Sequence, residues 1–263
     1  MAMAGKPVVH PERKVTGFRP LKALHHFGRL VKDKEDTEQV FHIIEALKGR
    51  KSLRQMKAFV ATDEARHLMQ RDEDLVTSLD DHARWAHCAP NSLARHYVDF
   101  MEREGLTAAG LVAESHKFKP REERFDDLYE WYVERLRDTH DLFHVLTGYG
   151  RDPLGELCLL GFSYEQNHNP GVLFIALLGA RKTKQESGLR EPVDAAIREG
   201  RRLGREAKKL AHQDLLAMLP DDIDEVRARL DLGTPRAYRR CVELFRELNP
   251  QYGLLEERLA LAA

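Results

Sequence analysis

The chain lacks a long apolar run and has few cysteines. No stretch of its 263 residues approaches the ~18 consecutive apolar residues of a membrane-spanning helix. The three cysteines, Cys88, Cys158 and Cys241, lie far apart without a CxxC pair, which favours a reducing intracellular compartment over a disulfide framework. The first twenty residues also lack the apolar core of a secretory signal peptide. We therefore expect neither secretion nor a transmembrane helix.

The sequence also lacks an excess of one charge. Charged residues make up 32% of the chain, yet the formal net charge is −1. No overall field attracts nucleic acid, and we predict no nucleic-acid partner. Gly-rich phosphate loops, a nucleophile elbow and a dinucleotide-binding fingerprint are missing as well. The common nucleotide-binding and serine-hydrolase motifs therefore offer no site.

The strict alternation of a β-strand is missing too, which indicates a helical protein. Val and Ile are sparse beside Leu, Ala, Arg and Glu, and apolar residues make up 42% of the chain, enough for a sizeable core. The linkers are short and composition does not shift along the chain. These features predict an all-α fold, a single-domain helical bundle.

Start and stop signals place several of the expected helices. Ser92 reads as the N-cap of a helix over 93–104 that Gly105 ends. We expect further helices over 20–32, 123–147 and 153–166, a long one over 190–218 and a last one over 235–247. Prolines in the first twenty residues predict an extended arm there.

The strongest pattern is His140-Asp141-x-x-His144, followed by Glu156. On a helix, His140 and His144 lie one turn apart and about 40° apart around the axis, with Asp141 in the same sector. Two imidazoles and two carboxylates at this spacing can hold one divalent cation. We predict His140, Asp141, His144 and Glu156 as the ligands of a metal ion, and as the catalytic residues if that ion takes part in a reaction.

Glu156 reaches the histidines only if the chain turns back. Along a continuous helix it would lie about 18 Å from His144. Gly148 and Gly150 can end the first helix, and Asp152-Pro153 reads as the N-cap and first residue of the next. The sequence therefore predicts a metal site in a helical hairpin.

The alternative is that both histidines are core residues with satisfied hydrogen bonds. They lie on an apolar stripe that includes Leu136 and Phe143. Two histidines and an acid on a buried stripe are costly to leave unpaired, so we favour the metal site. Two imidazoles with carboxylates suit zinc first, with iron, manganese or cobalt as alternatives.

A second feature is the apolar run 171–180 with the basic segment after it. The run is too short to span a bilayer, and we interpret it as a buried core helix, the alternative being a segment that dips into a membrane face. Residues 181–209 carry ten basic and five acidic side chains. This excess attracts an anionic leaflet or substrate, or it is an ordinary solvated helix face.

The metal motif and its surroundings resemble the ubiquinone (coenzyme Q) biosynthesis protein family, in its fourth component. The similarity spans roughly 18–232, leaving an extended N-terminal arm (1–17) and a C-terminal helical extension (233–263). The sequence departs from the family at Ala94, where Gly is common, and around 215–224, where an aromatic-rich stretch is missing. Besides the metal motif, the matching segments are Asp36-Thr37-Glu38-Gln39-Val40-Phe41, Pro90-Asn91-Ser92-Leu93, Tyr97-Val98-Asp99-Phe100-Met101, Thr147-Gly148-Tyr149, Leu154-Gly155-Glu156 and Val226-Arg227-Ala228-Arg229-Leu230.

The resemblance implies a helical, often dimeric protein that binds a divalent metal at His140, Asp141, His144 and Glu156. It implies a peripheral position on the membrane where ubiquinone is made: the inner face of the cell membrane, or the matrix side of the mitochondrial inner membrane in a eukaryote. The implied partners are a prenylated aromatic substrate or isoprenoid lipid and other ubiquinone-biosynthesis enzymes. The implied reaction is oxidative decarboxylation, in which hydroxyl replaces the ring carboxylate of a prenylated hydroxybenzoate.

Two other functions stay open at the level of sequence. One is a non-catalytic scaffold that binds isoprenoid lipid within a ubiquinone-biosynthesis complex and uses its metal only for structure. The other is a soluble metal-dependent hydrolase. A zinc peptidase would need Glu in place of Asp141 as the base, and a phosphohydrolase would need a further His and Asp that the sequence does not place.

Overall fold

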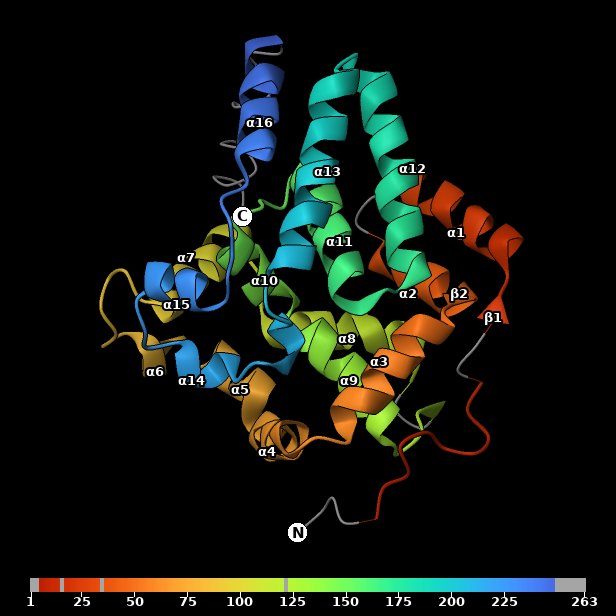
Figure 1. The fold of residues 1–263 in the computed structure, drawn as a ribbon, viewed down its shortest axis with the longest axis vertical. Coiled ribbons are helices and arrows are strands. Elements are labelled where there is room, and N and C mark those ends of the chain that lie inside the picture. The colour runs from red at the N-terminus through yellow and green to blue at the C-terminus, as the bar shows by residue number, and fades with distance from the viewer. Residues whose placement is uncertain (1–4, 15–16, 34–35, 121–122, 249–263) are drawn as a thin grey trace.

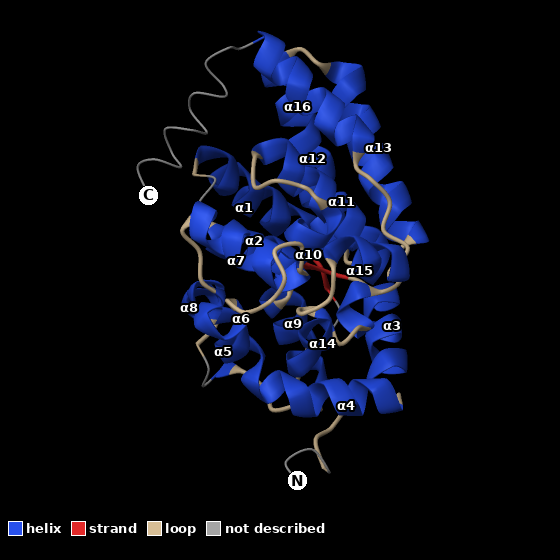
Figure 2. Ribbon diagram, turned by 90° about the vertical axis from the view of Figure 1, so that its left-hand side faces the viewer, coloured by secondary structure: helices blue, strands red, loops and turns tan. Residues whose placement is uncertain are grey.

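The computed structural model confirms the all-α fold (Figure 1). It describes all residues except 1–4, 15–16, 34–35, 121–122 and 249–263, and these residues form helices joined by short loops, with one pair of very short strands (Figure 2). The elements are β1 (Gly17–Phe18), α1 (Pro20–Lys32), α2 (Thr37–Ala46), β2 (Leu47–Lys48), α3 (Arg50–Val60), α4 (Asp63–Arg71), the 3-10 helix η1 (Asp72–Asp74), α5 (Leu75–Asp80), α6 (His82–Trp85), α7 (Leu93–Glu104), α8 (Ala108–Phe118), α9 (Leu128–Asp138), α10 (His140–Thr147), α11 (Pro153–Asn167), α12 (Pro170–Ser187), α13 (Arg190–Glu206), the 3-10 helix η3 (Leu210–His212), α14 (Leu215–Met218), α15 (Ile223–Arg229) and α16 (Arg236–Leu248).

Helix α11 occupies the centre of the fold. It packs along its length against α13 and α12, and α13 packs in turn against α16 (Figure 1). Leu159 and Phe162 of α11 are fully buried in the main core, which also takes in residues of α7, α10, α13, α15 and α16. The other face of α12 packs against α2. This layering places the start of α11 beside α10, where the predicted metal ligands lie.

Local capping signals predicted several helix ends correctly. The Ser92 hydroxyl accepts a hydrogen bond from the Arg95 N–H, and α7 runs over the predicted residues to its left-handed end at Gly105. An isolated β-bridge joins Ser92 to Asp222 at the start of α15. The chain therefore secures the beginnings of α7 and α15 to each other.

The predicted continuous helix over 123–147 is wrong, because α9 begins only at Leu128 and a break at Thr139 separates it from α10. The Thr139 hydroxyl donates to the Arg135 carbonyl at 2.7 Å, a local bond that competes with regular helical pairing. Arg135 is itself buried and donates to the carbonyls of Ala211 and Gln213. Tertiary contacts thus hold the turn at which the helix breaks.

The predicted long helix over 190–218 is also wrong. Helix α13 ends at Glu206, and Ala207 is extended. The next residue, Lys208, donates its backbone N–H to the Leu230 carbonyl, and the Lys209 ammonium donates to the carbonyls of Glu165 and Gln166 at the end of α11. These bonds replace helical pairing and turn the chain across α11.

The described part of the N-terminal arm is non-helical and contains turns and bends. Backbone N–H groups of Leu128 and Tyr129 donate to carbonyls of residues 7 and 8. The Arg13 guanidinium, which is buried, pairs with Asp127 at 2.7 Å and with Glu130 at 2.6 Å. The arm therefore covers the start of α9. The short strands β1 and β2 pair antiparallel after this arm, and the sequence did not predict them.

The apolar run 171–180, which we interpreted as a buried core helix, is only partly buried. In α12, Ile175, Ala176 and Ala180 are buried, but Leu177 is 50% exposed. Most of the basic side chains that follow have acidic partners. The pairs are Lys182 with Glu186, Lys184 with Asp194, Arg198 with Glu191, Arg202 with Glu206, and both Arg201 and Arg205 with Glu165.

Candidate metal centre

The predicted hairpin forms as the sequence indicated. Helix α10 ends at Gly148, whose φ of 75° lies in the left-handed region that favours glycine. One oxygen of Asp152 accepts hydrogen bonds from the N–H groups of Leu154 and Gly155, and Pro153 begins α11. The chain reverses within residues 148–152, and Glu156 in the first turn of α11 faces α10.

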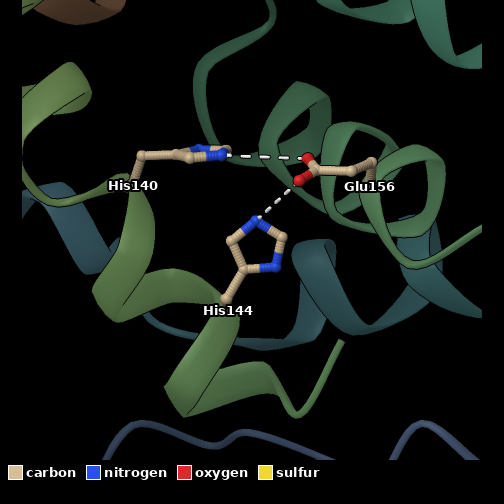
Figure 3. A group of neighbouring side chains, drawn as sticks. All are labelled: His140, His144 and Glu156. Atoms are coloured by element: carbon tan, nitrogen blue, oxygen red, sulfur yellow. Dashed lines mark ion pairs between the residues drawn. The ribbon is translucent and has the colours of Figure 1, made fainter. Parts of the chain in front are cut away.

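The turn brings three of the four predicted ligands together (Figure 3). Nε2 of His144 lies 3.3 Å from Oε1 of Glu156, and Nε2 of His140 lies 3.9 Å from Oε2. One ligand atom from each residue falls within 4.8 Å of the other two. Ligand atoms about 2.1 Å from a tetrahedral ion lie about 3.4 Å apart, so the side chains need to move only slightly closer to hold a cation.

The hydrogen bonding of His144 prepares it as a ligand. Its ring is fully buried, and Nδ1 lies 3.0 Å from the Tyr149 carbonyl, which can only accept. Nδ1 therefore carries the proton of the neutral ring, and the Nε2 lone pair points at Glu156. Nε2 has no hydrogen-bond partner of good geometry among the described residues.

A nitrogen lone pair and a carboxylate repel each other when they face one another, and a positive charge between them removes this repulsion. Without a metal, a proton takes that role: burial alone would lower the pKa of His144, but Glu156 outweighs it and raises that pKa. Burial alone would likewise raise the pKa of Glu156, and the two histidines lower it instead. Burial and nearby His144 lower the pKa of His140. The site thus favours a neutral His140 and an ionised Glu156, with one positive charge, a proton or a metal ion, between Glu156 and His144.

The donor set fits a divalent metal with open positions. Two imidazoles and one carboxylate are the protein ligands of many catalytic zinc sites and of non-haem iron sites that use oxygen. The side chains of His140 and Glu156 are each about one third exposed, whereas that of His144 is not exposed. A cation here would be anchored on the buried side and open toward the side of His140.

Asp141 is not among the three converging residues. Its side chain is buried, and its charge acts on His140, His144 and the Tyr97 hydroxyl, which is buried without a hydrogen-bond partner among the described residues. The structure places it next to the site but not at the point where the ligand atoms meet. Its role as a ligand stays a prediction. The further His and Asp of a phosphohydrolase are also not in the described cluster.

Sequence reasoning missed the residues that hold the turn. The Tyr238 hydroxyl of α16 donates to Asp152 and accepts from the Gly150 N–H at 3.0 Å. Its ring contacts Tyr149, whose carbonyl orients His144. No local signal could have indicated this bond, because Tyr238 and Asp152 are 86 positions apart.

A comparison with known families matches residues 30–236 to the model described as Coenzyme Q (ubiquinone) biosynthesis protein Coq4. The chain is also similar to the protein named ubiquinone biosynthesis protein coq4, mitochondrial, of Penicillium rubens, with 27% identity over 60% of this chain and 52% of that protein. The protein of the same name from Aspergillus fumigatus is 26% identical over 67% of this chain and 59% of its own length. The chain thus spans little more than half of these relatives.

A solved structure shares the fold. The crystal structure of a protein from Nostoc punctiforme, described as a ubiquinone biosynthesis protein, superposes with a TM-score of 0.55 over 81% of this chain and 98% of that one, at 17% identity. The family model covers the turn, α10, α11 and nearly all of the main core, and ends where α16 begins. The chain therefore belongs to the Coq4 family of coenzyme Q (ubiquinone) biosynthesis proteins.

Proposed function

We propose that this chain carries out a metal-dependent oxidative decarboxylation in ubiquinone biosynthesis. The ring carboxylate of a prenylated hydroxybenzoate is replaced by hydroxyl. The observation that carries the proposal is the pairing of a buried imidazole lone pair with a carboxylate at 3.3 Å, open on the side of His140. A divalent cation held there by His140, His144 and Glu156 would orient a substrate carboxylate and stabilise negative charge on the ring oxygen.

The reaction balances with dioxygen and a two-electron donor of the hydride or quinol class. One oxygen atom forms the new ring C–O bond as the bond to the carboxylate breaks. Carbon dioxide leaves, and the second oxygen atom becomes water after taking up two electrons and protons. The chain contributes by holding the reactants: His144 and Glu156 are set on packed helices, and the Tyr149 carbonyl keeps the His144 ring in one orientation.

The identity of the metal is part of the proposal. Zinc fits two histidines and one glutamate, and iron fits the same set where oxygen takes part. Manganese and cobalt are further candidates. If Asp141 rotates into the site, a fourth protein ligand closes one of the open positions, which suits a structural zinc better than a catalytic ion.

Metal removal tests the proposed function. We expect a chelator to abolish loss of the ring carboxylate, measured by mass spectrometry of a prenylated hydroxybenzoate incubated with the protein, dioxygen and a reductant. Addition of one equivalent of zinc or iron should restore it, because the three ligands lie on α10 and α11, which pack in the main core. Full activity of a protein shown by elemental analysis to be metal-free would contradict the proposal.

The second candidate is a non-catalytic scaffold that binds isoprenoid lipid, and one surface favours it. Four of the large apolar side chains that are exposed lie on neighbouring elements: Phe18 (77%), Leu21 (82%), Leu24 (54%) and Leu177 (50%). A groove of about 420 Å³ lies between α1 and α12, and its lining includes Phe27, Leu178, Arg181 and Lys182. We call this surface the α1–α12 face.

The α1–α12 face supports peripheral membrane association under either candidate. Apolar side chains with basic residues beside them suit the boundary between acyl chains and anionic headgroups. No helix in the described part of the chain is long and apolar enough to cross a membrane. We propose that the face rests on the membrane in which ubiquinone is made; the relatives described above are named as mitochondrial proteins. We further propose a homodimer and contacts with other ubiquinone-biosynthesis enzymes.

Negative charges introduced on this face should detach the protein from membranes. We expect Leu21→Glu and Leu177→Glu each to weaken binding to vesicles of phosphatidylcholine and phosphatidylglycerol by roughly 10-fold or more, because each takes one exposed leucine out of contact with the acyl chains. Vesicle co-sedimentation measures this. The control is Val133→Glu on α9, which is 41% exposed and lies outside the face. Equal binding of all three variants and the unchanged protein would refute this membrane orientation.

A further inference from the structure

The turn at the candidate metal centre carries an arginine, Arg151, to which neither the motif nor the comparisons assign a role. Arg151 lies between Gly150 and Asp152, and its Nε is 3.9 Å from Oε1 of Glu156, beyond hydrogen-bonding distance. Its side chain is one third exposed, as are those of Glu156 and His140. Among the described residues the guanidinium makes no other ion pair and no side-chain hydrogen bond, which leaves its donors available to a ligand.

The backbone on both sides of Arg151 is held in place. The Gly150 N–H donates to the Tyr238 hydroxyl, and that hydroxyl donates to Asp152. The second oxygen of Asp152 caps α11. The turn also packs closely on α11, since a Cβ built on Gly155 would lie 2.1 Å from the Gly150 carbonyl oxygen. The structure thus presents Arg151 from a rigid turn, as a residue that positions a ligand requires.

The charges change when a divalent cation enters the site. Glu156 would then bind the cation and be less available to Arg151, which lies 3.9 Å from it. A divalent ion and a guanidinium would then lie side by side at the exposed side of the site. Glu156 is the one carboxylate among the three converging ligands, so it would be the one group there to balance both positive charges. Such a pair of positive groups favours an oxyanion, and the planar guanidinium matches a carboxylate with two parallel hydrogen bonds.

We propose that Arg151 binds the carboxylate of an aromatic substrate at the open side of the metal site. This rests on the proposed function, which it deepens by naming the residue that selects a ring carrying a carboxylate. Arg151 holds that group beside the metal, where it leaves the ring. A prenylated ring that has lost its carboxylate loses this contact, which favours release of the product.

A simpler role predicts different behaviour. If Arg151 only balances the charge of Glu156, its removal takes a positive group away from the metal site. Metal affinity should then stay the same or rise, and the affinity for a carboxylate probe should not change. The two roles are therefore separated by measuring both affinities on the same samples.

The test uses the full chain in zinc-loaded and metal-free form, with 4-hydroxybenzoate as the probe and isothermal titration calorimetry as the measurement. We expect Arg151→Gln to weaken probe binding by about 10- to 100-fold while zinc content is kept, and Arg151→Lys to fall in between, because charged hydrogen bonds are lost or reduced to one point contact. The matched control is Arg239→Gln, whose exposed guanidinium lies beside Gly148 on the other side of the turn.

Several outcomes would overturn the proposal. Unchanged probe affinity of Arg151→Gln, or no binding by the unchanged protein, refutes it. Inorganic phosphate that displaces the probe at lower concentration overturns the assignment to a carboxylate. If the unchanged protein binds the probe but holds no zinc, and Arg151→Gln weakens that binding, the anion site is confirmed. The metal-dependent function is then refuted instead.

Discussion

Replacing Glu156 by glutamine is expected to lower the affinity for zinc by at least about 100-fold, since even the outer partners of metal ligands contribute 10- to 100-fold. The amide keeps the shape of the side chain but removes the charge that pairs with His144 and His140. Carboxylate loss from the ring should fall with metal content. Elemental analysis after dialysis and mass spectrometry of the product measure the two quantities on one preparation.

The control for this variant is Glu191→Gln, an exposed glutamate paired with Arg198 far from the turn. It should keep both metal and activity. Thermal unfolding followed by circular dichroism shows whether Glu156→Gln remains folded. A folded Glu156→Gln protein that keeps its zinc would show that Glu156 is not a ligand and would leave Asp141 as the acid to examine.

The hairpin at the candidate metal centre could be predicted because its signals are local. Gly148 supplies a left-handed residue, and Asp152 caps the helix that Pro153 begins. Both signals act within a few residues and do not depend on the remainder of the fold. For the same reason α7 was predicted to the residue between Ser92 and Gly105.

The break between α9 and α10 could not be predicted, because tertiary contacts decide it. Thr139 is compatible with a helix interior, and its bond to the Arg135 carbonyl matters only where Arg135 is held by residues after α13. The exposed face of α12 was missed for a related reason. An apolar run shows that burial is favourable, but it does not show how much covering surface the other helices provide.

Contacts at long range also complete the site itself. The metal motif lies inside the family-matched region 30–236, whereas Tyr238 lies just outside it. Its hydroxyl nonetheless connects Gly150 with the residue that caps α11. Helix α16, which the sequence indicated only as an extension, is therefore part of what holds Glu156 and Arg151 in position.

Substituting alanine for Gly155 should show how tightly this turn is packed. The added Cβ would meet the Gly150 carbonyl oxygen at 2.1 Å and its carbon at 2.8 Å, both backbone atoms that cannot rotate away. We expect a loss of about 1–3 kcal/mol in the free energy of unfolding, the usual cost of overpacking. Zinc affinity should fall as well, because relieving the contact moves the turn away from α11 and Glu156 follows Gly155 directly.

The matched variant is Gly28→Ala in α1, where a Cβ meets no atom within 4 Å. Alanine is favoured over glycine inside a helix, so this change should raise the free energy of unfolding by about 0.5–1 kcal/mol and leave zinc affinity unchanged. Urea titrations of both variants give the two opposite shifts. If Gly155→Ala is as stable as the unchanged protein and binds zinc equally well, the turn is not closely packed on α11, and the rigid presentation of Arg151 loses its support.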